Sequence, residues 1–598
     1  MSHPRPATLI VLAIAATALL PAQETSAPDD PARIGVPRDW SHRHQIFTQP
    51  ENFDRLSALQ LDPRYWHQVY NQTNRTIEGP ARNRASKSPV RLSPMTVGKT
   101  AFDALPTPDV PAVDWGESMG TSALAFTNLN SYPAKYSFNV ANPVPSCTGD
   151  YVVFTLPTPT TTRFNVVAFK NLYVNNAGTG SCPGTTPQIL FAYNASQNGG
   201  SMTSSPSLSL DGKQIAVIEN AAAAQFHVIK WRAGDVSNTF GNPYNAAKMV
   251  NCATNGAVAP CEWNVVYSTG RATLSAPFID YATDTAYVSD DIGKVYSIKP
   301  VFGGGQPVVT STVAISGSTA MTPPVYDSVS KNVFVADGTG KLYYIRTSAV
   351  SAGTCLSGSA PCQGSTTLTV ATGAAVIEAP TVDSTNGKVY VYSRSAPTAG
   401  NSSVVQASTT LTGTSVATIG PTGTQIVYGG AFSNNYYNSP ATGMLYVCGT
   451  NASNIPQLYG ITFTGTTMNA GAAARGPLSL ATATAACGPV TEVFNQSTSK
   501  DELYVSVSNR CTTGITGGCM RRFDITSTFP SAATNTVAEA GGTMGIIIDN
   551  VKNNLNGNDA ETNIYFVTRS AQSCSKHTDG TATATGNCAV KLTQSALQ

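Results

Sequence analysis

Residues 276–296 and 323–343 are two copies of one sequence unit. The first copy reads Ala276-Pro277-Phe278-Ile279-Asp280, then Thr285-Ala286-Tyr287-Val288-Ser289-Asp290, then Gly293-Lys294-Val295-Tyr296. The second reads Pro323-Pro324-Val325-Tyr326-Asp327, then Asn332-Val333-Phe334-Val335-Ala336-Asp337, then Gly340-Lys341-Leu342-Tyr343. Matching landmarks, such as Asp280 and Asp327, lie 47 residues apart. Short runs rich in Val, Tyr and Phe between Asp/Gly turns predict strands, and a period of this length predicts the blades of a β-propeller.

Further units of the same kind extend over most of the chain. We predict an all-β fold: a single β-propeller of four-stranded blades with an irregular, short-helical extension at its N-terminus. The count is eight blades, or seven if the poorly patterned sixth unit is divided wrongly. The predicted strands outside the two quoted copies are 136–140, 150–156, 164–169 and 188–193; 206–210, 214–218, 225–231 and 263–267; 380–383 and 388–392; 426–428, 444–447 and 457–463; 490–494, 503–507 and 521–525; and 546–548, 564–567 and 589–592.

The last unit offers only three strands before the chain ends. Residues 112–120, which include Trp115, resemble residues 262–270, which we expect to form an outermost blade strand. We therefore expect the strand 113–119 to complete the last blade and close the ring. The predicted domains are a signal peptide at 1–22, an N-terminal extension with a basic linker at 23–110, and the propeller at 111–598.

Composition limits the possible functions. Of the 598 residues, 41% are hydrophobic, which is enough for a large core, and only 12% are charged. The formal net charge is +2, so the chain has no global field that would attract nucleic acid or an anionic membrane. Abundant Gly, Ser, Thr and Ala suit the many turns of a secreted all-β protein.

The first residues have the pattern of an export signal. His3 and Arg5 precede the apolar run 7–20, which Pro21-Ala22-Gln23 follows. A charged start, an apolar core and small residues beyond it predict a signal peptide that is cleaved near Ala22. We expect a secreted, periplasmic or cell-surface protein; an uncleaved membrane anchor is the alternative.

The extension differs from the propeller in composition. Residues 51–70 carry several aromatic and aliphatic side chains interrupted by Pro63, which predicts two short helices. Residues 75–99 contain six basic residues and one acidic residue among Pro, Ser and Asn. This segment has the pattern of a flexible linker, and contact with an acidic surface polymer is the functional alternative.

All twelve cysteines follow residue 146 and fall into neighbouring couples. Sequential pairing is the simplest connectivity, although spacing alone does not prove it, and an exported chain should oxidise them to disulfides. A metal site is the weaker interpretation because no C-x-x-C couple occurs. The predicted pairs, each within roughly one blade, are Cys147/Cys182, Cys252/Cys261, Cys355/Cys362, Cys448/Cys487, Cys511/Cys519 and Cys574/Cys588.

The repeats resemble those of the quinoprotein-like and NHL/YVTN-like propeller superfamilies. Asp39-Trp40-Ser41-His42, Trp115 and residues 132–138 (Tyr-Pro-Ala-Lys-Tyr-Ser-Phe) are similar to segments of a group of exported bacterial propeller proteins without an assigned activity. The resemblance implies the fold and leaves the function open. A quinone-dependent dehydrogenase of this fold would carry a cofactor-stacking Trp, a Ca²⁺ shell and Trp-docking repeats. The chain has only five Trp and no docking repeat, which disfavours that activity.

Few residues suggest chemistry of their own. Asp290 and Asp337 lie where hairpins turn, which explains them without a metal. Residues 553–561 (Asn-Asn-Leu-Asn-Gly-Asn-Asp-Ala-Glu) are the better Ca²⁺ candidate, although their spacing differs from the calcium-loop pattern and a polar turn is the simpler interpretation. Asp280, Asp327 and Asp383 end inner strands, where we expect them to bond backbone in the next turn; a ring of ligands is the alternative. Of His227 and His577, the former is expected to be a packed strand residue.

The sequence thus predicts a binding or scaffolding propeller, a monomer, whose partner is an extracellular glycan or protein. No catalytic residue and no cofactor is assigned, with Ca²⁺ as the one cofactor to test. The alternative is a secreted carbohydrate-active enzyme with its site at the central channel.

Overall fold

The fold is known from a computed structural model, which describes only some residues of the chain. These are residues 36–48, 59, 62–72, 113–119, 130–137, 146–157, 164–175, 178, 180–235, 249–315, 319–347, 362–367, 376–394, 401–421, 423–495, 498–549, 563–574 and 585–593.

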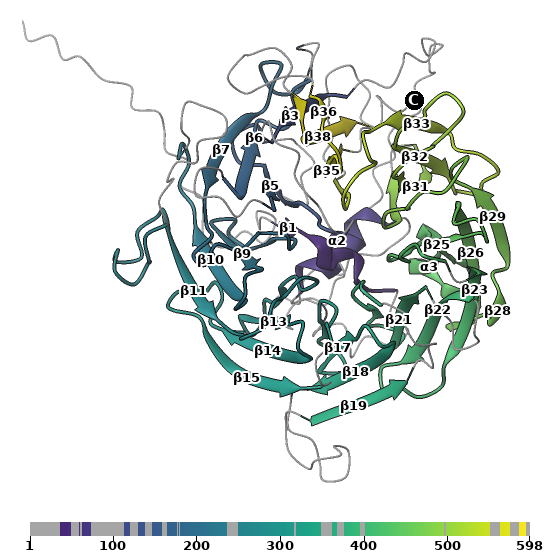
Figure 1. The fold of residues 1–598 in the computed structure, drawn as a ribbon, viewed down its shortest axis with the longest axis horizontal. Helices are drawn as coiled ribbons and strands as arrows, with labels where there is room; N and C mark the ends of the chain where they lie inside the picture. The colour runs from purple at the N-terminus through teal and green to yellow at the C-terminus, as the bar shows by residue number, and fades with distance from the viewer. Residues whose placement is uncertain are drawn as a thin grey trace, which may run out of the picture.

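Eight antiparallel sheets follow one another around a ring, which confirms the predicted all-β propeller (Figure 1). We number these blades in chain order and give their strands from the inside outward. Blade 1 is β4 (Ala134–Ser137), β5 (Tyr151–Thr155), β6 (Val166–Lys170) and β7 (Gln188–Tyr193). Blade 2 is β8 (Ser207–Leu208), β9 (Gln214–Glu219), β10 (Gln225–Lys230) and β11 (Cys261–Val266). Blade 3 is β12 (Phe278–Asp280), β13 (Thr285–Ser289), β14 (Lys294–Lys299) and β15 (Val308–Ala314), and blade 4 is β16 (Val325–Asp327), β17 (Asn332–Ala336), β18 (Lys341–Arg346) and β19 (Cys362–Thr367).

The other four blades have the same plan with small additions. Blade 5 is β20 (Thr381–Asp383), β21 (Lys388–Ser393), β22 (Asn401–Ser408) and β23 (Ser415–Pro421), with β28 (Gly471–Ala472) added to its outer edge. Blade 6 is β24 (Ala431–Phe432), β25 (Met444–Thr450), β26 (Pro456–Thr464) and β29 (Arg475–Ser479), with β27 (Thr467–Met468) also on β26. Blade 7 is β30 (Thr491–Asn495), β31 (Lys500–Val507), β32 (Cys519–Asp524) and β33 (Asn535–Ala538). Blade 8 is β34 (Ile547–Asp549), β35 (Asn563–Val567), β38 (Cys588–Thr593) and β3 (Trp115–Ser118); β36 (Gln572–Ser573) and β37 (Thr585–Gly586) form a separate hairpin.

The repeated Asp of the two quoted copies shapes a hairpin. One carboxylate oxygen of Asp290 accepts the backbone N–H groups of Ile292 and Lys294, and the other accepts the hydroxyl of Tyr296 at 2.6 Å. Asp337 makes the same bonds 47 residues later, to Thr339, Lys341 and Tyr343. Gly293 and Gly340 both have φ of +84°, a conformation that costs glycine little. The prediction that these acids serve the turns is therefore confirmed.

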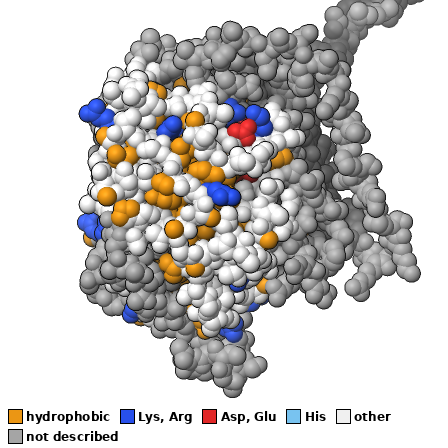
Figure 2. All heavy atoms as spheres, turned by 90° about the vertical axis from the view of Figure 1, so that its right-hand side faces the viewer, with side chains coloured by type: hydrophobic (Ala, Val, Ile, Leu, Met, Phe, Trp, Pro, Cys, Tyr) orange, Lys and Arg blue, Asp and Glu red, His pale blue; other side chains and the backbone are white. Residues whose placement is uncertain are grey.

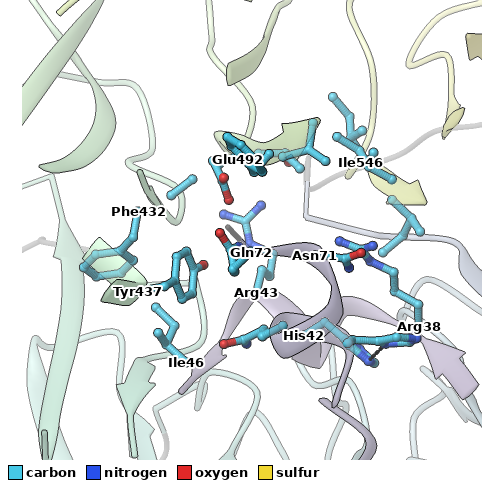
Figure 3. Close-up of a pocket in the computed structure, with 18 of the residues that line it drawn as sticks. Arg38, His42, Arg43, Ile46, Asn71, Gln72, Phe432, Tyr437, Glu492 and Ile546 are labelled. Atoms are coloured by element: carbon cyan, nitrogen blue, oxygen red, sulfur yellow. Dashed lines mark hydrogen bonds between the residues drawn. The ribbon is translucent and has the colours of Figure 1, made fainter. Parts of the chain in front are cut away.

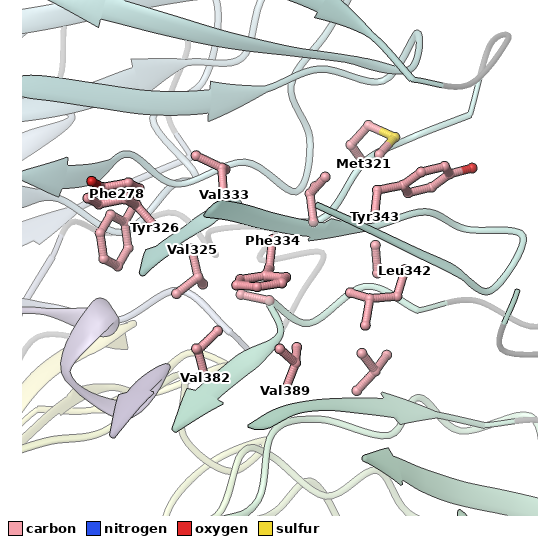
Figure 4. Packing of buried hydrophobic residues seen from close by; sticks show 14 of the residues in the cluster. Phe278, Met321, Val325, Tyr326, Val333, Phe334, Leu342, Tyr343, Val382 and Val389 are labelled. Atoms are coloured by element: carbon pink, nitrogen blue, oxygen red, sulfur yellow. The ribbon is translucent and has the colours of Figure 1, made fainter. Parts of the chain in front are cut away.

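Side chains on alternate strand positions fill the space between blades. In blade 4, Val333 and Phe334 point to opposite faces of β17, and Phe334 lies towards Val382 and Val389 of blade 5 (Figure 4). This alternation is the period of two that a strand imposes. Because a neighbouring blade covers each face of blade 4, both residues are fully buried.

The inner strand of blade 6 is not where the sequence predicts it. We expected it at 426–428, but these residues form no strand and β24 starts at Ala431. The carbonyl groups of Gly429 and Gly430 accept hydrogen bonds from the Arg43 guanidinium at 2.7 and 3.4 Å. A partner remote in sequence thus takes these carbonyls, which no local pattern could indicate.

The two ends of the propeller share blade 8. β3 pairs antiparallel with β38, and Trp115 lies opposite Lys591. The Trp115 ring is fully buried between blades 8 and 1, near Tyr565 and Phe169, and its indole N–H donates to the Leu172 carbonyl at 2.9 Å. The last blade is therefore completed by a strand that precedes the first blade.

Five of the six predicted cysteine pairs are disulfides in the part of the chain that the structure describes, with Cα–Cα distances of 4.9–6.5 Å. Cys355, of the predicted pair Cys355/Cys362, lies outside the described residues. Disulfides are typical of proteins that fold in an oxidising compartment. The five bonds are Cys147–Cys182, Cys252–Cys261, Cys448–Cys487, Cys511–Cys519 and Cys574–Cys588.

Cys448–Cys487 departs from the expectation that each pair stays within one blade. It joins β25 of blade 6 to a residue that bridges Val507 of blade 7, so this bond crosses between blades. The sequence could not indicate this, because residue 487 lies in the connection between two blades and either blade could have held it.

Cys182 also has a role that the sequence did not predict. We assigned it only as the partner of Cys147, and that bond is present. Cys182 lies in the connection between β6 and β7, outside any strand, and its N–H donates to the Tyr173 carbonyl at 3.2 Å. The residue is also buried, in the same hydrophobic cluster as Trp115 of β3. The cluster around Cys182 includes Trp115, which comes from β3, a strand that joins the last blade. The sequence around Cys182 does not contain this contact and therefore could not predict that Cys182 is buried.

Part of the N-terminal extension lies inside the ring (Figure 1). β1 (Val36–Arg38) pairs antiparallel with β4 of blade 1, and β2 (Gln45–Ile46) pairs parallel with β20 of blade 5. Between them lies the 3₁₀ helix η2 (Trp40–Arg43), and α2 (Pro63–Asn71) follows. We call residues 36–48 and 62–72 the channel segment. Two further short helices, α3 (Asn434–Asn438) and η4 (Pro440–Thr442), lie in blade 6. Among the described helices, none is long and apolar enough to cross a membrane.

Candidate functional site

The channel segment is built from local signals. Asp39 caps η2: its carboxylate accepts the N–H of Ser41 at 2.9 Å, while the His42 ring accepts the N–H of Asp39 at 3.0 Å. Asp62 caps α2 in the same way by accepting the N–H of Arg64, and Pro63 occupies the first helical position. Asp before a helix and Pro at its start are strong initiation signals. These two short helices are thereby fixed before any contact with the blades is considered.

Arg64 anchors α2 to blade 3. Its guanidinium is fully buried and donates to the Ile279 carbonyl at 3.0 Å, to the Ser41 hydroxyl at 2.6 Å and to Asp62 at 3.1 Å. It also lies 4.3 Å from the centre of the Phe278 ring. A buried guanidinium needs such partners, because a charge without them is costly in the interior.

A second anchor lies at blades 5 and 6. His44 Nε2 is 3.0 Å from a carboxylate oxygen of Glu378, and both side chains are buried. The backbone of the same stretch bonds blade 5, with the Val382 N–H donating to the His44 carbonyl at 2.7 Å. The channel segment therefore joins blade 1, blade 3, blade 5 and the start of blade 6 across the centre of the ring.

Two histidines of the segment face a small polar cavity (Figure 3). His42 Nε2 lies 2.8 Å from Nδ1 of His67. Because Nδ1 of His42 accepts from the Asp39 backbone, Nε2 carries the proton and donates it to His67. Burial lowers the pKa of His42 and lowers that of His67 further, so the pair is neutral at pH 7. The cavity is about 80 Å³. Pockets for small-molecule ligands have roughly 300–1,000 Å³, so this one suits a few water molecules.

Two acids of blade 7 complete that region. Burial raises the pKa of Asp501 to about 7 and, together with Asp501, raises that of Glu492 well above its usual range. Glu492 lines the cavity with Gln72, from the end of α2 (Figure 3). Acids that keep a proton and neutral histidines are components of acid–base sites. Here, however, His42, His67 and Glu492 line a water-sized space between the channel segment and the blades.

A much larger opening, about 370 Å³, lies between blades 3 and 4. We call it the interblade groove. Its inner end is closed by Tyr287 of blade 3 and Tyr326 of blade 4, whose rings stack at 5.2 Å with an interplanar angle of 25°. Beyond this pair, blade 3 presents Ser297 and Ser311, while blade 4 presents Val333 and Ile345. Blade 3 therefore supplies most of the groove's hydroxyl groups, together with Val295 and Val313, and blade 4 supplies Val333, Ile345 and one hydroxyl, Thr347.

The register of the two sheets explains why the blades separate there. Tyr287, Ser297 and Ser311 are successive cross-strand neighbours on β13, β14 and β15. Tyr326, Val333 and Ile345 form the facing row on β16, β17 and β18. Two large rings meet at the inner end, but two serines face aliphatic side chains farther out. Because serine is small, the space that a larger side chain at these two positions would fill stays open.

The groove carries hydroxyl groups and one charge. Of its fourteen lining side chains, six are Ser or Thr, three are Tyr, four are aliphatic and one, Asp280, is acidic. No lysine or arginine lines it within the described chain. Burial raises the pKa of Tyr326 to about 12 and that of Tyr287 further, so both phenols stay protonated and can donate hydrogen bonds.

One side of the disc can be inspected for charged side chains in Figure 2. On the side of the disc that carries β28 and β29, charged side chains are few and scattered among small polar and hydrophobic ones (Figure 2). This agrees with the low charged fraction of the sequence. The described residues on this side thus form no concentrated patch of charge.

The acids predicted at the ends of inner strands serve their own turns. Asp280 accepts the N–H of Ala282, Asp327 that of Ser330, and Asp383 that of Asn386. Asp280 alone of the three also lines the groove. His227 is a buried strand residue of β10, as expected, and lies between two glutamates. His577 and the Ca²⁺ candidate 553–561 lie outside the described residues. In the described ranges, no three His, Cys, Asp or Glu are grouped so that they could hold a metal ion.

Comparison with known proteins adds only distant likenesses. No family model and no curated protein matches the chain. Among solved structures, BamB from Moraxella catarrhalis is 11% identical with a TM-score of 0.36, over 68% of this chain and 89% of that one. Sqt1 from Saccharomyces cerevisiae is 8% identical with a TM-score of 0.42, over 79% and 99%. Sqt1 from Chaetomium thermophilum, solved with the N-terminus of the ribosomal protein L10, is 10% identical with a TM-score of 0.43, over 79% and 100%. Likenesses this distant carry no argument about function.

Proposed function

We propose that the protein is an exported binding or scaffolding propeller whose partner, a glycan or a protein, binds at the blades rather than in the central channel. One observation supports this: the channel contains the chain's own residues. Trp40 and Arg64 are buried at its centre, and the channel segment is hydrogen-bonded to blades on different sides of the ring.

The same observation disfavours the enzyme alternatives. A carbohydrate-active or quinone-dependent enzyme of this fold would assemble its site in the channel from side chains of several blades. In this protein, such side chains bond the channel segment instead: Glu378 lies against His44, and the Ile279 carbonyl accepts from Arg64. The space that is left beside His42 and His67 is about 80 Å³.

Export is supported by two independent features. Residues 1–22 have the pattern of a signal peptide, and five disulfides are of the kind that form in oxidising compartments. The protein then acts in the periplasm, at the cell surface or outside the cell. N-terminal sequencing of the exported protein should find a mature chain that begins near residue 23.

A combined binding and turnover assay tests the proposal. The purified mature protein is melted with soluble neutral and acidic oligosaccharides and with quinone cofactor plus Ca²⁺. A ligand at about 100 times its Kd adds roughly 2.7 kcal/mol to the free energy of unfolding, which is a readily measured rise in Tm. We expect a rise with a glycan and no release of reducing ends in the same mixture. Hydrolysis of the glycan, or a rise with quinone and Ca²⁺ together with dye reduction, would contradict the proposal.

A further inference from the structure

We propose that the interblade groove between blades 3 and 4 is a binding site for a neutral saccharide chain. This inference rests on the proposed binding function and adds to it a place and a ligand class. The groove's volume of about 370 Å³ falls within the roughly 300–1,000 Å³ of pockets that hold small-molecule ligands.

The groove exists because blade 3 departs from its own repeat. At the offset of 47 residues, Tyr287 corresponds to Phe334, and both are large and buried. Ser297, however, corresponds to Tyr344, which packs against the core that blade 4 shares with blade 5. The register confirms the match, since Tyr287 pairs with Ser297 and Phe334 pairs with Tyr344. A serine therefore stands where the next blade places a ring.

A β-bulge gathers hydroxyl groups at the serine. The pairing of β14 with β15 shifts between Ser297 and Ile298, and this leaves Thr310 as the extra residue. As a result, Thr310 and Ser311 both face Ser297, whose hydroxyl lies 2.8 Å from Oγ1 of Thr310 and 2.6 Å from Oγ of Ser311. Bulges often re-aim side chains at functional positions. Each hydroxyl keeps unused acceptor capacity for a ligand.

A second polar cluster lies at the turn between β12 and β13 and also lines the groove. Thr283 donates to Asp280 at 2.5 Å and lies 3.0 Å from the Thr285 hydroxyl. Between the two clusters lie the stacked tyrosines and the aliphatic row of blade 4. Two clusters of hydroxyl groups, with tyrosine rings and aliphatic side chains between them, complement a sugar chain, which has hydroxyls at its edges and C–H groups on its faces.

Charge selects among possible ligands. Asp280 is the only charged side chain among those that line the groove in the described chain. A phosphate, a nucleotide or an acidic sugar would meet this carboxylate without a compensating cation. A neutral saccharide is not repelled by Asp280, because the carboxylate can accept hydrogen bonds from the hydroxyl groups of the sugar.

The test uses a variant that fills the groove with the residue of the neighbouring blade. Ser297→Tyr copies the side chain that blade 4 accepts at the same position, so the fold should tolerate it. Thr312→Tyr is the matched control, because Thr312 is exposed and lies on the other face of β15. Calorimetric titrations of the full mature chain use neutral hexasaccharides of glucose, xylose, mannose and N-acetylglucosamine, and hexagalacturonate as the acidic comparison.

We expect at least one neutral hexasaccharide to bind the wild type and the Thr312→Tyr variant alike, with at least tenfold weaker binding to Ser297→Tyr and to hexagalacturonate. Equal affinity in Ser297→Tyr, or preference for the acidic chain, would overturn the groove assignment and leave the proposed binding function standing. Absence of any saccharide binding by the wild type would also overturn the inference. The proposed binding function itself would be contradicted if the combined assay showed that the protein hydrolyses the glycan. If Ser297→Tyr melts at the same temperature as the wild type, its weaker binding is not caused by unfolding.

Discussion

At the scale of single residues, buried charge in this protein occurs where a specific partner is present. His227 on β10 lies 3.1 Å from Glu219 of β9 and 3.5 Å from Glu262 of β11, and all three side chains are buried. Burial lowers the pKa of His227, but its bonds to the two glutamates outweigh burial and raise it to about 9. Glu219, which also accepts from Ser196 and from the N–H of Gly200, has its pKa lowered to about 2. His227 is therefore a cation between strands, not an unused base.

The His227 site predicts a specific pH dependence of stability. Because the pKa of His227 is higher in the folded state than the unfolded value near 6.5, its stabilisation is complete below about pH 6.5 and is lost as pH rises through 9. Replacement His227→Gln should lower the free energy of unfolding by roughly 3 kcal/mol at pH 6, and the difference from wild type should shrink towards pH 9. Urea denaturation at several pH values measures it. A difference that does not change between pH 6 and 9 would show that the histidine contributes packing alone.

At the scale of elements, the channel segment is a pair of capped helices and two very short strands that together cross the ring. Its strands add to β4 and β20, whose inner edges would otherwise face the channel. Its buried polar groups, Arg64 and His44, bond blades 3 and 5. Such a segment both covers strand edges and ties together blades that are not neighbours.

Arg64 is the residue whose loss should free this segment. Replacement Arg64→Met keeps the length of the side chain and removes five donors, so the Ile279 carbonyl and the Asp62 carboxylate lose their bonds to the guanidinium. Breaking a buried charge pair costs about 3–5 kcal/mol. We expect chymotrypsin to cut at Tyr65 and Trp66 at least tenfold faster than in wild type, at a temperature where the blades remain folded. Arg64→Lys keeps the charge but loses the planar set of donors of the guanidinium. Its cleavage rate should therefore lie between those of the wild type and Arg64→Met. Equal cleavage rates in all three proteins would mean that other contacts hold the segment.

Most blades could be predicted from the sequence because their strands and turns depend on local information. Within seven residues, Asp290 accepts the backbone bonds of the turn, Gly293 supplies the positive φ, and Tyr296 donates to the Asp290 carboxylate. A helix that begins at Pro63 was predicted and is α2, whereas the Asp39 cap of η2 was visible in the sequence but was not used. The docking of these helices could not be predicted, because β1 and β2 have three and two residues and their partners lie about 100 and 337 residues away. The groove had a visible signal that was not used: Ser297 stands where the second copy has Tyr344.

At the scale of the whole molecule, the ring depends on one seam inside blade 8, where β3 pairs with β38. Buried ion pairs flank it: Lys135 of β4 lies 2.7 Å from Asp549 of β34, and Lys591 of β38 lies 3.0 Å from Asp114. The four main strands of each other blade follow one another in the chain, but blade 8 takes β3 from the opposite end of the propeller. The seam is thus held by pairing and packing rather than by a covalent connection.

Trp115 tests that seam, and Trp263 provides a control of the same size. Both indoles are buried on an outermost blade strand, but Trp263 belongs to blade 2, whose strands are consecutive in the chain. Replacement of a buried Trp by Ala costs about 3–5 kcal/mol at either position through lost contacts and a cavity. In Trp115→Ala, we expect the loss to detach β3, so that amide protons of β38 and of blade 1 exchange before the rest of the ring opens. In Trp263→Ala, faster exchange should be confined to blade 2 and its immediate neighbours. Hydrogen exchange read by mass spectrometry separates the two patterns. If Trp115→Ala lowers Tm without early exchange in β38 and blade 1, the ring opens elsewhere, and the seam is as strong as any other blade boundary.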